Sequence, residues 1–229
     1  MTYRSGSKFW SQSFAFSCGP AALGGVLCSL GWDPRQDRRL AELEIWREST
    51  AVACPGAHPL GLALAAKRRG YDAEVFVTGP RPWLWAHIRS RHAFPRLRDY
   101  RTIEAALVHQ CAYQALPVRP NAPPPGRLGA GLLLSAASEG RNSEPDPHWI
   151  GLIPGPKGIL ILDPLRRAPY RSSLSSREWW DASGFEQTRS WVEIRPASEP
   201  IKFGHRPQRR PTRSTELSRT PRPIPAKKR

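Results

Sequence analysis

The chain has 229 residues, 39% of them hydrophobic and nine of them tryptophan, which is enough for one folded domain with a core of its own. Its formal net charge is +16, and residues 196–229 carry half of that charge, with ten Lys/Arg against two acidic residues. No apolar run approaches the roughly 18 residues of a membrane-spanning helix, and residues 1–12 lack the apolar stretch of a signal peptide, so we expect a cytoplasmic protein rather than a membrane or secreted one.

Helices are predicted for the first half of the chain. Apolar residues recur at helical spacing after Cys18, and Gly31 ends the run. Gly24 and Gly25 inside this run indicate that another backbone packs closely against the helix. The predicted helices cover residues 19–30, 37–48, 59–69, 82–91 and 102–116, and a short strand is predicted at residues 73–77.

Strands are predicted for the second half, after a loop rich in Pro and Gly at residues 121–129. The segment PGPK at residues 154–157 predicts a tight turn, and residues 175–178 resemble a capping box at the start of a further helix. Short apolar runs predict buried strands at residues 131–135, 148–153, 158–162 and 190–194. Helices followed by mostly antiparallel strands predict an α+β fold.

The last segment of the chain differs from the rest in composition. Residues 196–229 contain seven prolines and few apolar residues, so they cannot bury enough surface to offset the entropy of ordering them. We therefore expect a folded domain at residues 1–195 and a disordered Pro/Arg-rich basic tail at residues 196–229. Two interpretations of the tail stay open: a solvated extension, or weak contact with polyanions such as nucleic acid or an anionic membrane surface.

Cysteine usage points to one special thiol. The four cysteines follow no metal-ligand spacing, and we expect no metal or other cofactor. Cys18 directly precedes a predicted helix, whose N-terminal N–H groups favour a thiolate, and Gly19 would permit the close approach of a substrate. Gln12 lies six residues upstream, where its amide could stabilise an oxyanion. A packed structural thiol is the alternative interpretation of Cys18.

A histidine and an aspartate are predicted to lie together far along the chain. His148 begins one predicted strand, and Asp163 ends the next. The tight turn between these strands would bring their distant ends side by side. The carboxylate could then orient the imidazole, which would take the proton of the thiol. A surface histidine and a strand-ending Asp-Pro pair are the alternatives.

These motifs resemble those of the bacteriocin-processing, double-glycine-leader peptidases, a papain-fold cysteine peptidase family. The resemblance lies in Gln12, in SCGPAAL at residues 17–23, in PHW at residues 147–149 and in LDP at residues 162–164. The stretches at residues 42–48 and 61–70 look like a stand-alone bacterial branch of that family.

The resemblance implies a two-lobed papain-like fold, in which a helical lobe with Cys18 faces an antiparallel sheet lobe with His148 and Asp163. It also implies hydrolysis of peptide bonds, with Cys18 as nucleophile, His148 as base, Asp163 as orienting group and Gln12 in the oxyanion hole.

We therefore expect a cysteine peptidase that acts on a peptide or protein substrate through a thioester intermediate, with peptide processing as its role. Three alternatives stay open. The first is a related acyl-transfer enzyme, such as an amidase, ligase or transglutaminase-like protein. The second is a catalytically silent peptide-binding module with a polyanion-binding tail. The third is a nucleic-acid binder dominated by its tail, although the body shows no nucleic-acid motif.

Other residues are weaker candidates. His58 lies in a loop between two predicted helices, where it could line the cleft and contact substrate, or be a surface histidine. Trp149, beside His148, is expected either to shield the base and contact substrate or to pack in the core.

Three acidic residues recur at helical spacing in the second predicted helix: Glu42, Glu44 and Glu48. A solvated helix face explains this pattern better than a carboxylate site. Cys28 and Cys111 fall on apolar helical stretches and are expected in the core.

Overall fold

The computed structural model describes residues 9–50, 56–77, 97–120, 129–137, 146–173 and 190–197. Several expectations lie outside these residues: the helix at residues 82–91, the capping box at residues 175–178, Cys54, and the tail beyond residue 197. The domain boundary expected at residue 195 falls within the last strand, which continues to Pro196.

Three of the described helices lie within one residue of their predicted bounds, whereas the fourth begins at Leu97 instead of residue 102 and ends at Tyr113 instead of residue 116. The described helices are α1 (Cys18–Ser29), α2 (Arg38–Ser49), α3 (Pro59–Arg68) and α4 (Leu97–Tyr113). The side chain of Asp37 caps α2 by accepting a hydrogen bond from the N–H of Arg39. After α1 and α3 the chain turns at Gly31 and Gly70, whose positive φ angles of +102° and +83° favour glycine.

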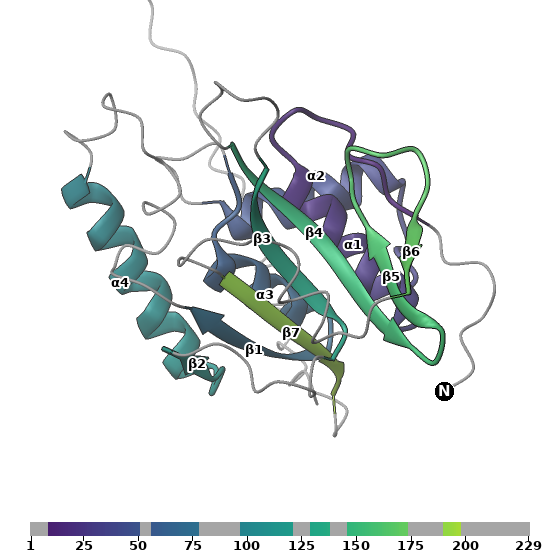
Figure 1. Ribbon diagram of the computed structural model, residues 1–229. Helices are drawn as coiled ribbons and strands as arrows, with labels where there is room; N and C mark the ends of the chain where they lie inside the picture. Colours follow the sequence, from purple (N-terminus) through teal and green to yellow (C-terminus); the bar gives the residue numbers. More distant parts are fainter. Residues whose placement is uncertain are drawn as a thin grey trace, which may run out of the picture.

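The strands form one mixed sheet in the described part of the chain (Figure 1). They are β1 (Tyr71–Val77), β2 (Val118–Arg119), β3 (Gly131–Ala137), β4 (Asp146–Gly155), β5 (Gly158–Leu162), β6 (Tyr170–Ser172) and β7 (Ser190–Pro196). Their order in the sheet is β2-β1-β7-β3-β4-β5-β6. Only the short β1–β2 pair is parallel; the other pairs are antiparallel. The chain therefore has an α+β fold, as predicted.

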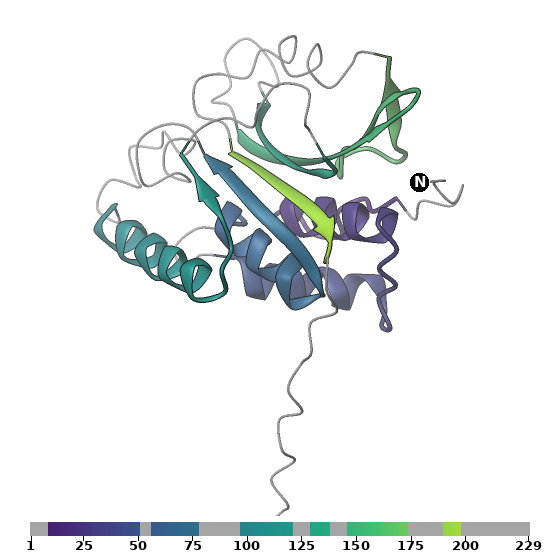
Figure 2. The ribbon, with the colours of Figure 1, turned by 90° about the horizontal axis from the view of Figure 1, so that it is seen from below.

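Helices α1, α2 and α3 gather on one side of the sheet (Figure 2). Helix α1 packs on β3 and β4, α3 packs on β1 and β7, and α2 packs on the other two helices. The strands β2 and β6 were not predicted from the sequence. No helix in the described ranges is long and apolar enough to cross a membrane.

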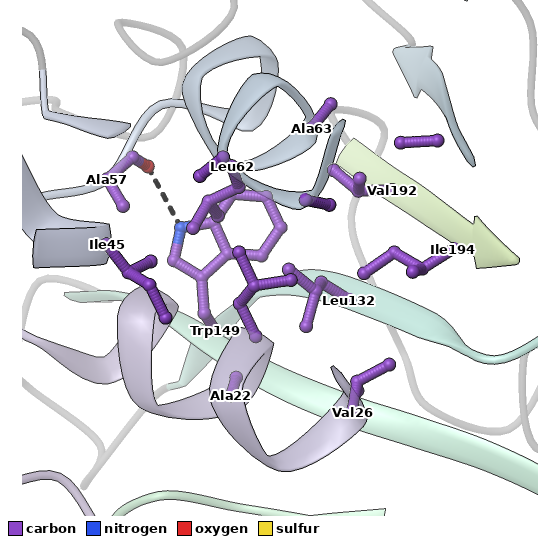
Figure 3. Packing of buried hydrophobic residues seen from close by; sticks show 14 of the residues in the cluster. Ala22, Val26, Ile45, Ala57, Leu62, Ala63, Leu132, Trp149, Val192 and Ile194 are labelled. Carbon is purple, nitrogen blue, oxygen red and sulfur yellow. Dashed lines mark hydrogen bonds between the residues drawn. The ribbon is translucent and has the colours of Figure 1, made fainter. Parts of the chain in front are cut away.

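The main core lies between these helices and the sheet, around Trp149 of β4 (Figure 3). The Trp149 side chain is 2% exposed, and its indole N–H donates to the carbonyl oxygen of Ala57 at 3.0 Å. Its neighbours in this cluster come from helices and strands alike: Ala22, Val26, Ile45, Leu62, Leu132 and Val192. Truncation of such a side chain to alanine typically costs about 3–5 kcal/mol, so Trp149 holds the helices against the strand that also carries His148.

The glycines inside α1 make room for side chains, and not for another backbone as predicted. A Cβ atom at Gly24 would lie 2.2 Å from the ring of Trp10, so the close neighbour is this tryptophan and not another backbone. At Gly25 the close neighbour is the side chain of Leu162. Glycine thus lets the segment before α1 lie directly on the helix.

Candidate active site

Cys18 is the first residue of α1, and its side chain is partly exposed. The N–H groups of the first turn of a helix lack partners within the helix, and the helix dipole adds positive potential there. No acidic residue lies in this first turn of α1. Unpaired backbone N–H groups at this position can therefore donate to a negatively charged group beside the sulfur.

The hairpin of β4 and β5 brings His148 and Asp163 together. The antiparallel register pairs Gly151 with Leu162, so Asp163, directly after β5, lies alongside the first half of β4. Nε2 of His148 lies 2.8 Å from Oδ1 of Asp163, which is a hydrogen-bonding distance. The hairpin predicted from the sequence thus forms, and it accounts for this pair.

Cys18 forms the third member of this cluster. Its thiol lies near enough to His148 to act on the pKa of the imidazole. Because Nε2 of the imidazole is engaged by Asp163, Nδ1 is the nitrogen left for the sulfur. The packing of α1 on β4 makes this contact possible, and Gly151 of β4 lies against Val26 of α1.

The charges of this cluster set the protonation of the histidine. Burial lowers the pKa of His148, but hydrogen bonds to Asp163 and Cys18 and the charges of both groups outweigh it and raise the pKa from 6.5 to about 9. For Asp163, burial raises the pKa, while the bonds from His148 and the Leu165 N–H, with the charges of His148 and Arg166, lower it below its usual value. The arrangement thus favours an imidazolium beside a carboxylate at neutral pH.

Gln12 lies in the extended segment before α1 and is tied to the residue after Asp163. Its backbone N–H donates to the carbonyl oxygen of Pro164 at 2.9 Å. Its side-chain Oε1 is buried and has no hydrogen-bond partner among the described residues. The structure therefore places the backbone of Gln12 beside the turn that carries Asp163.

The three predicted substrate contacts, Gly19, His58 and Trp149, have structural roles instead. His58 is 3% exposed: its Nδ1 caps α3 by accepting from the Leu60 N–H, and its Nε2 lies 3.4 Å from Glu104. It is neither a surface histidine nor available to a substrate. Trp149 is buried in the core, which is the alternative that the sequence analysis left open for it. A Cβ at Gly19 would lie 2.8 Å from Ala57 and 2.9 Å from Trp149, so Gly19 permits close core packing rather than the approach of a substrate.

The expectation of a solvated acidic face on α2 is wrong for one of its residues. Glu44 is exposed and accepts from Gln36, and Glu48 pairs with Arg69. Glu42, in contrast, is fully buried, and its carboxylate contacts Ser13 and Ser17 in the segment that leads to Cys18. Sequence reasoning grouped this residue with Glu44 and Glu48, although it belongs to the helix face of Ala41, Ile45 and Ser49, which is buried.

Two other cysteines are described. Cys111 is buried in the core, as predicted, and burial raises its pKa to about 11, which keeps the thiol neutral. Cys28 is only partly buried at the edge of the same core. In the described part of the chain, no group of three or more His, Cys, Asp or Glu side chains could hold a metal ion.

Comparison with known protein families gives a match for most of the chain. The sequence model of a protein family described as "Peptidase_C39 like family" matches residues 7–166. The matched region covers more than two thirds of the chain and contains Gln12, Cys18, His148 and Asp163. No curated protein matches the chain.

Proposed function

Because this chain belongs to the Peptidase_C39 like family, we propose that it is a cysteine peptidase with Cys18 as nucleophile, His148 as general base and acid, and Asp163 as orienting group. The observation that carries the proposal is the placement of one imidazole between Asp163, which is 2.8 Å away, and Cys18, with both groups raising the pKa of His148. The bacteriocin-processing peptidases that the motifs resemble suggest a peptide or protein substrate and a role in peptide processing.

The protonation of His148 supplies the first step. With a pKa of about 9, His148 is an imidazolium at neutral pH. In the proposed mechanism Cys18 reacts as the thiolate beside it. The thiolate attacks the carbonyl carbon of the scissile peptide bond. The negative charge that develops on the carbonyl oxygen is stabilised by the side-chain amide N–H of Gln12 and by N–H groups at the start of α1.

The tetrahedral intermediate then collapses. The C–N bond breaks, Nδ1–H of His148 gives its proton to the leaving amine, and the acyl group stays on Cys18 as a thioester. Neutral His148 next takes a proton from water, which attacks the thioester and releases the carboxylic acid and the thiolate. Asp163 holds Nε2–H throughout and thereby keeps Nδ1 directed at the sulfur.

The finer architecture in this proposal is that of papain-like enzymes. Cys18 lies on the helical side, at the start of α1, whereas His148 and Asp163 lie on the strand side, in the β4–β5 hairpin. A peptide would bind where these two sides meet. A binding module has no need of a thiol, an imidazole and a carboxylate in mutual contact, which is why catalysis is preferred here.

Selective alkylation tests the proposal. At pH 6, iodoacetamide should modify Cys18 and leave Cys28 and Cys111 unmodified, because the charged His148 stabilises the Cys18 thiolate. Mass spectrometry of the digested protein would identify the modified residue. The His148→Ala variant should lose this preference, and Cys18→Ala should abolish hydrolysis of p-nitrophenyl acetate. Equal labelling of the described cysteines in the wild-type protein would refute a catalytic Cys18.

A further inference from the structure

Glu42 on α2 makes an unusual set of contacts for a charged side chain. It is 0% exposed. Oε1 accepts from the backbone N–H of Ser13 at 2.8 Å and from the hydroxyl of Ser17, and Oε2 accepts from the hydroxyl of Ser13 at 2.7 Å. A buried carboxylate is costly unless hydrogen bonds replace its lost hydration. Here all of these bonds come from one short stretch of chain.

A second side chain of α2 holds the same stretch. Arg38, one helical turn before Glu42, donates to the carbonyl oxygens of Phe9 and Ser11; the first of these bonds measures 3.2 Å. The charges of Arg38 and Glu42 also interact favourably. Helix α2 thus holds both ends of the stretch at residues 9–17. The Arg38 guanidinium donates to carbonyl oxygens at the first end, and the Glu42 carboxylate accepts from N–H and hydroxyl groups at the second.

This stretch connects two parts of the proposed active site. Gln12 lies between the residues held by Arg38 and Glu42, and Ser17 directly precedes Cys18. On the other side, the backbone of Gln12 is bonded to Pro164, next to Asp163. The position of Gln12 relative to Cys18 is therefore determined by Glu42 from one side and by the Asp163 turn from the other.

We infer that Glu42 is a positioning residue, which sets the oxyanion-stabilising amide of Gln12 against the Cys18 sulfur without touching substrate itself. The inference rests on the proposed function. The charge of Glu42 by itself would slow the reactions of Cys18, because a negative charge near the start of α1 disfavours a thiolate. Geometry and electrostatics can thus be separated in one experiment.

The experiment compares two reactions of Cys18. Alkylation by iodoacetamide is a displacement at a saturated carbon and forms no oxyanion, whereas acylation by p-nitrophenyl acetate forms one. In Glu42→Gln, we expect the rate of acylation at pH 7 to fall about tenfold to hundredfold. A displacement of about 1 Å in a group that positions the reaction can cost about a hundredfold in rate. Alkylation should change less than about threefold, because it needs no oxyanion stabilisation. Glu44→Gln, the same substitution on the exposed face of α2, is the control and should leave both rates unchanged.

The ratio of acylation to alkylation decides among the outcomes. A lower ratio in Glu42→Gln supports the inference. Equal losses in both rates would indicate a smaller folded fraction, and faster rates for both reactions would indicate electrostatics alone; either result overturns the inference.

If Glu42→Gln does not fold, Ser13→Ala decides, because it removes only the hydroxyl bond to Oε2. Its acylation-to-alkylation ratio should fall about threefold, as for the loss of one hydrogen bond, and an unchanged ratio overturns the inference. A wild-type protein whose Cys18 does not react with the ester would instead refute the proposed function, and this inference with it.

Discussion

Two carboxylates act on the proposed site, one by bonding to His148 and the other through the segment before Cys18. Asp163 is partly accessible and bonds to His148, the Leu165 N–H and Arg166. Glu42 is fully buried and contacts neither His148 nor Cys18 in any hydrogen bond of the described residues. Asp163 therefore acts on the charge of the imidazole, whereas Glu42 acts on the position of the backbone that leads to Cys18.

Replacement of Asp163 by Asn should lower the pKa of His148 below its value of about 9. The substitution removes a charge and weakens a hydrogen bond, both of which raise this pKa, and it leaves the burial that lowers it. The imidazolium should then deprotonate at lower pH, so the alkaline limb of Cys18 acylation should move to lower pH as well. Titration of the His148 Cε1–H resonance by NMR measures the change.

A matched control for this titration is Asp37→Asn, which removes a carboxylate from the exposed cap of α2. The His148 titration of this variant should overlay that of the wild-type protein. A His148 pKa that stays near 9 in Asp163→Asn would contradict the assigned role of the aspartate.

At the scale of elements, α1 is buried along most of its length, from Gly19 to Leu27. The sheet covers one side of it through β4, and Trp10 of the preceding segment covers Gly24. The segment that carries Gln12 is therefore held in place by packing on α1 as well as by hydrogen bonds to α2. The packing of Trp10 on α1 explains why Gly24 occupies the middle of a helix, where glycine is intrinsically unfavourable.

Gly24→Ala tests the packing of this segment. In an ordinary helix this change stabilises by about 1 kcal/mol, but here the new Cβ would lie 2.2 Å from the Trp10 ring. Overpacking of this kind costs about 1–3 kcal/mol, so we expect a net loss of up to about 2 kcal/mol in the free energy of unfolding. Urea denaturation followed by tryptophan fluorescence measures it.

Gly155→Ala serves as the control, because a Cβ there would meet only a carbonyl oxygen at 3.6 Å. Its free energy of unfolding should change by less than about 0.5 kcal/mol. Stabilisation by Gly24→Ala would show that Trp10 does not press against α1.

At the scale of the whole molecule, the proposed site lies where the helices meet the sheet. The N-terminus of α1 meets the β4–β5 hairpin, and the two are held together by the core around Trp149. Strand β7 closes the sheet between β1 and β3, so the last described segment of the chain joins the first strand to the others.

Truncation after Ala197 tests the domain boundary and the basic tail together. The removed residues carry ten Lys/Arg and two acidic residues. Labelling of Cys18 by iodoacetamide should be unchanged, and affinity for a single-stranded DNA oligonucleotide should fall at least about tenfold at low salt, because phosphate contacts act through counterion release. Fluorescence anisotropy at two salt concentrations gives the affinity.

Loss of Cys18 labelling in the truncated protein would mean that the tail belongs to the active site. Unchanged DNA affinity would place the polyanion-binding surface on residues 1–197 and would favour the nucleic-acid hypothesis.

The sequence by itself determined the local elements of this protein. The starts and ends of α1, α2 and α3 follow from caps, glycines and apolar spacing, all of which act within a few residues of one another. The β4–β5 hairpin is also local, and for that reason the proximity of His148 and Asp163 could be predicted.

Only the tertiary structure decided which distant groups the buried polar and aromatic residues contact. Ser13 and Glu42 are 29 residues apart, and Trp149 and Ala57 are 92 apart. Helical periodicity places Glu42 beside Ala41 and Ile45 on the buried face, but it does not say which distant N–H and hydroxyl groups meet the carboxylate. The partners of Glu42 and His58 therefore depend on contacts that no local pattern encodes, and those contacts determine how the segment before Cys18 is held.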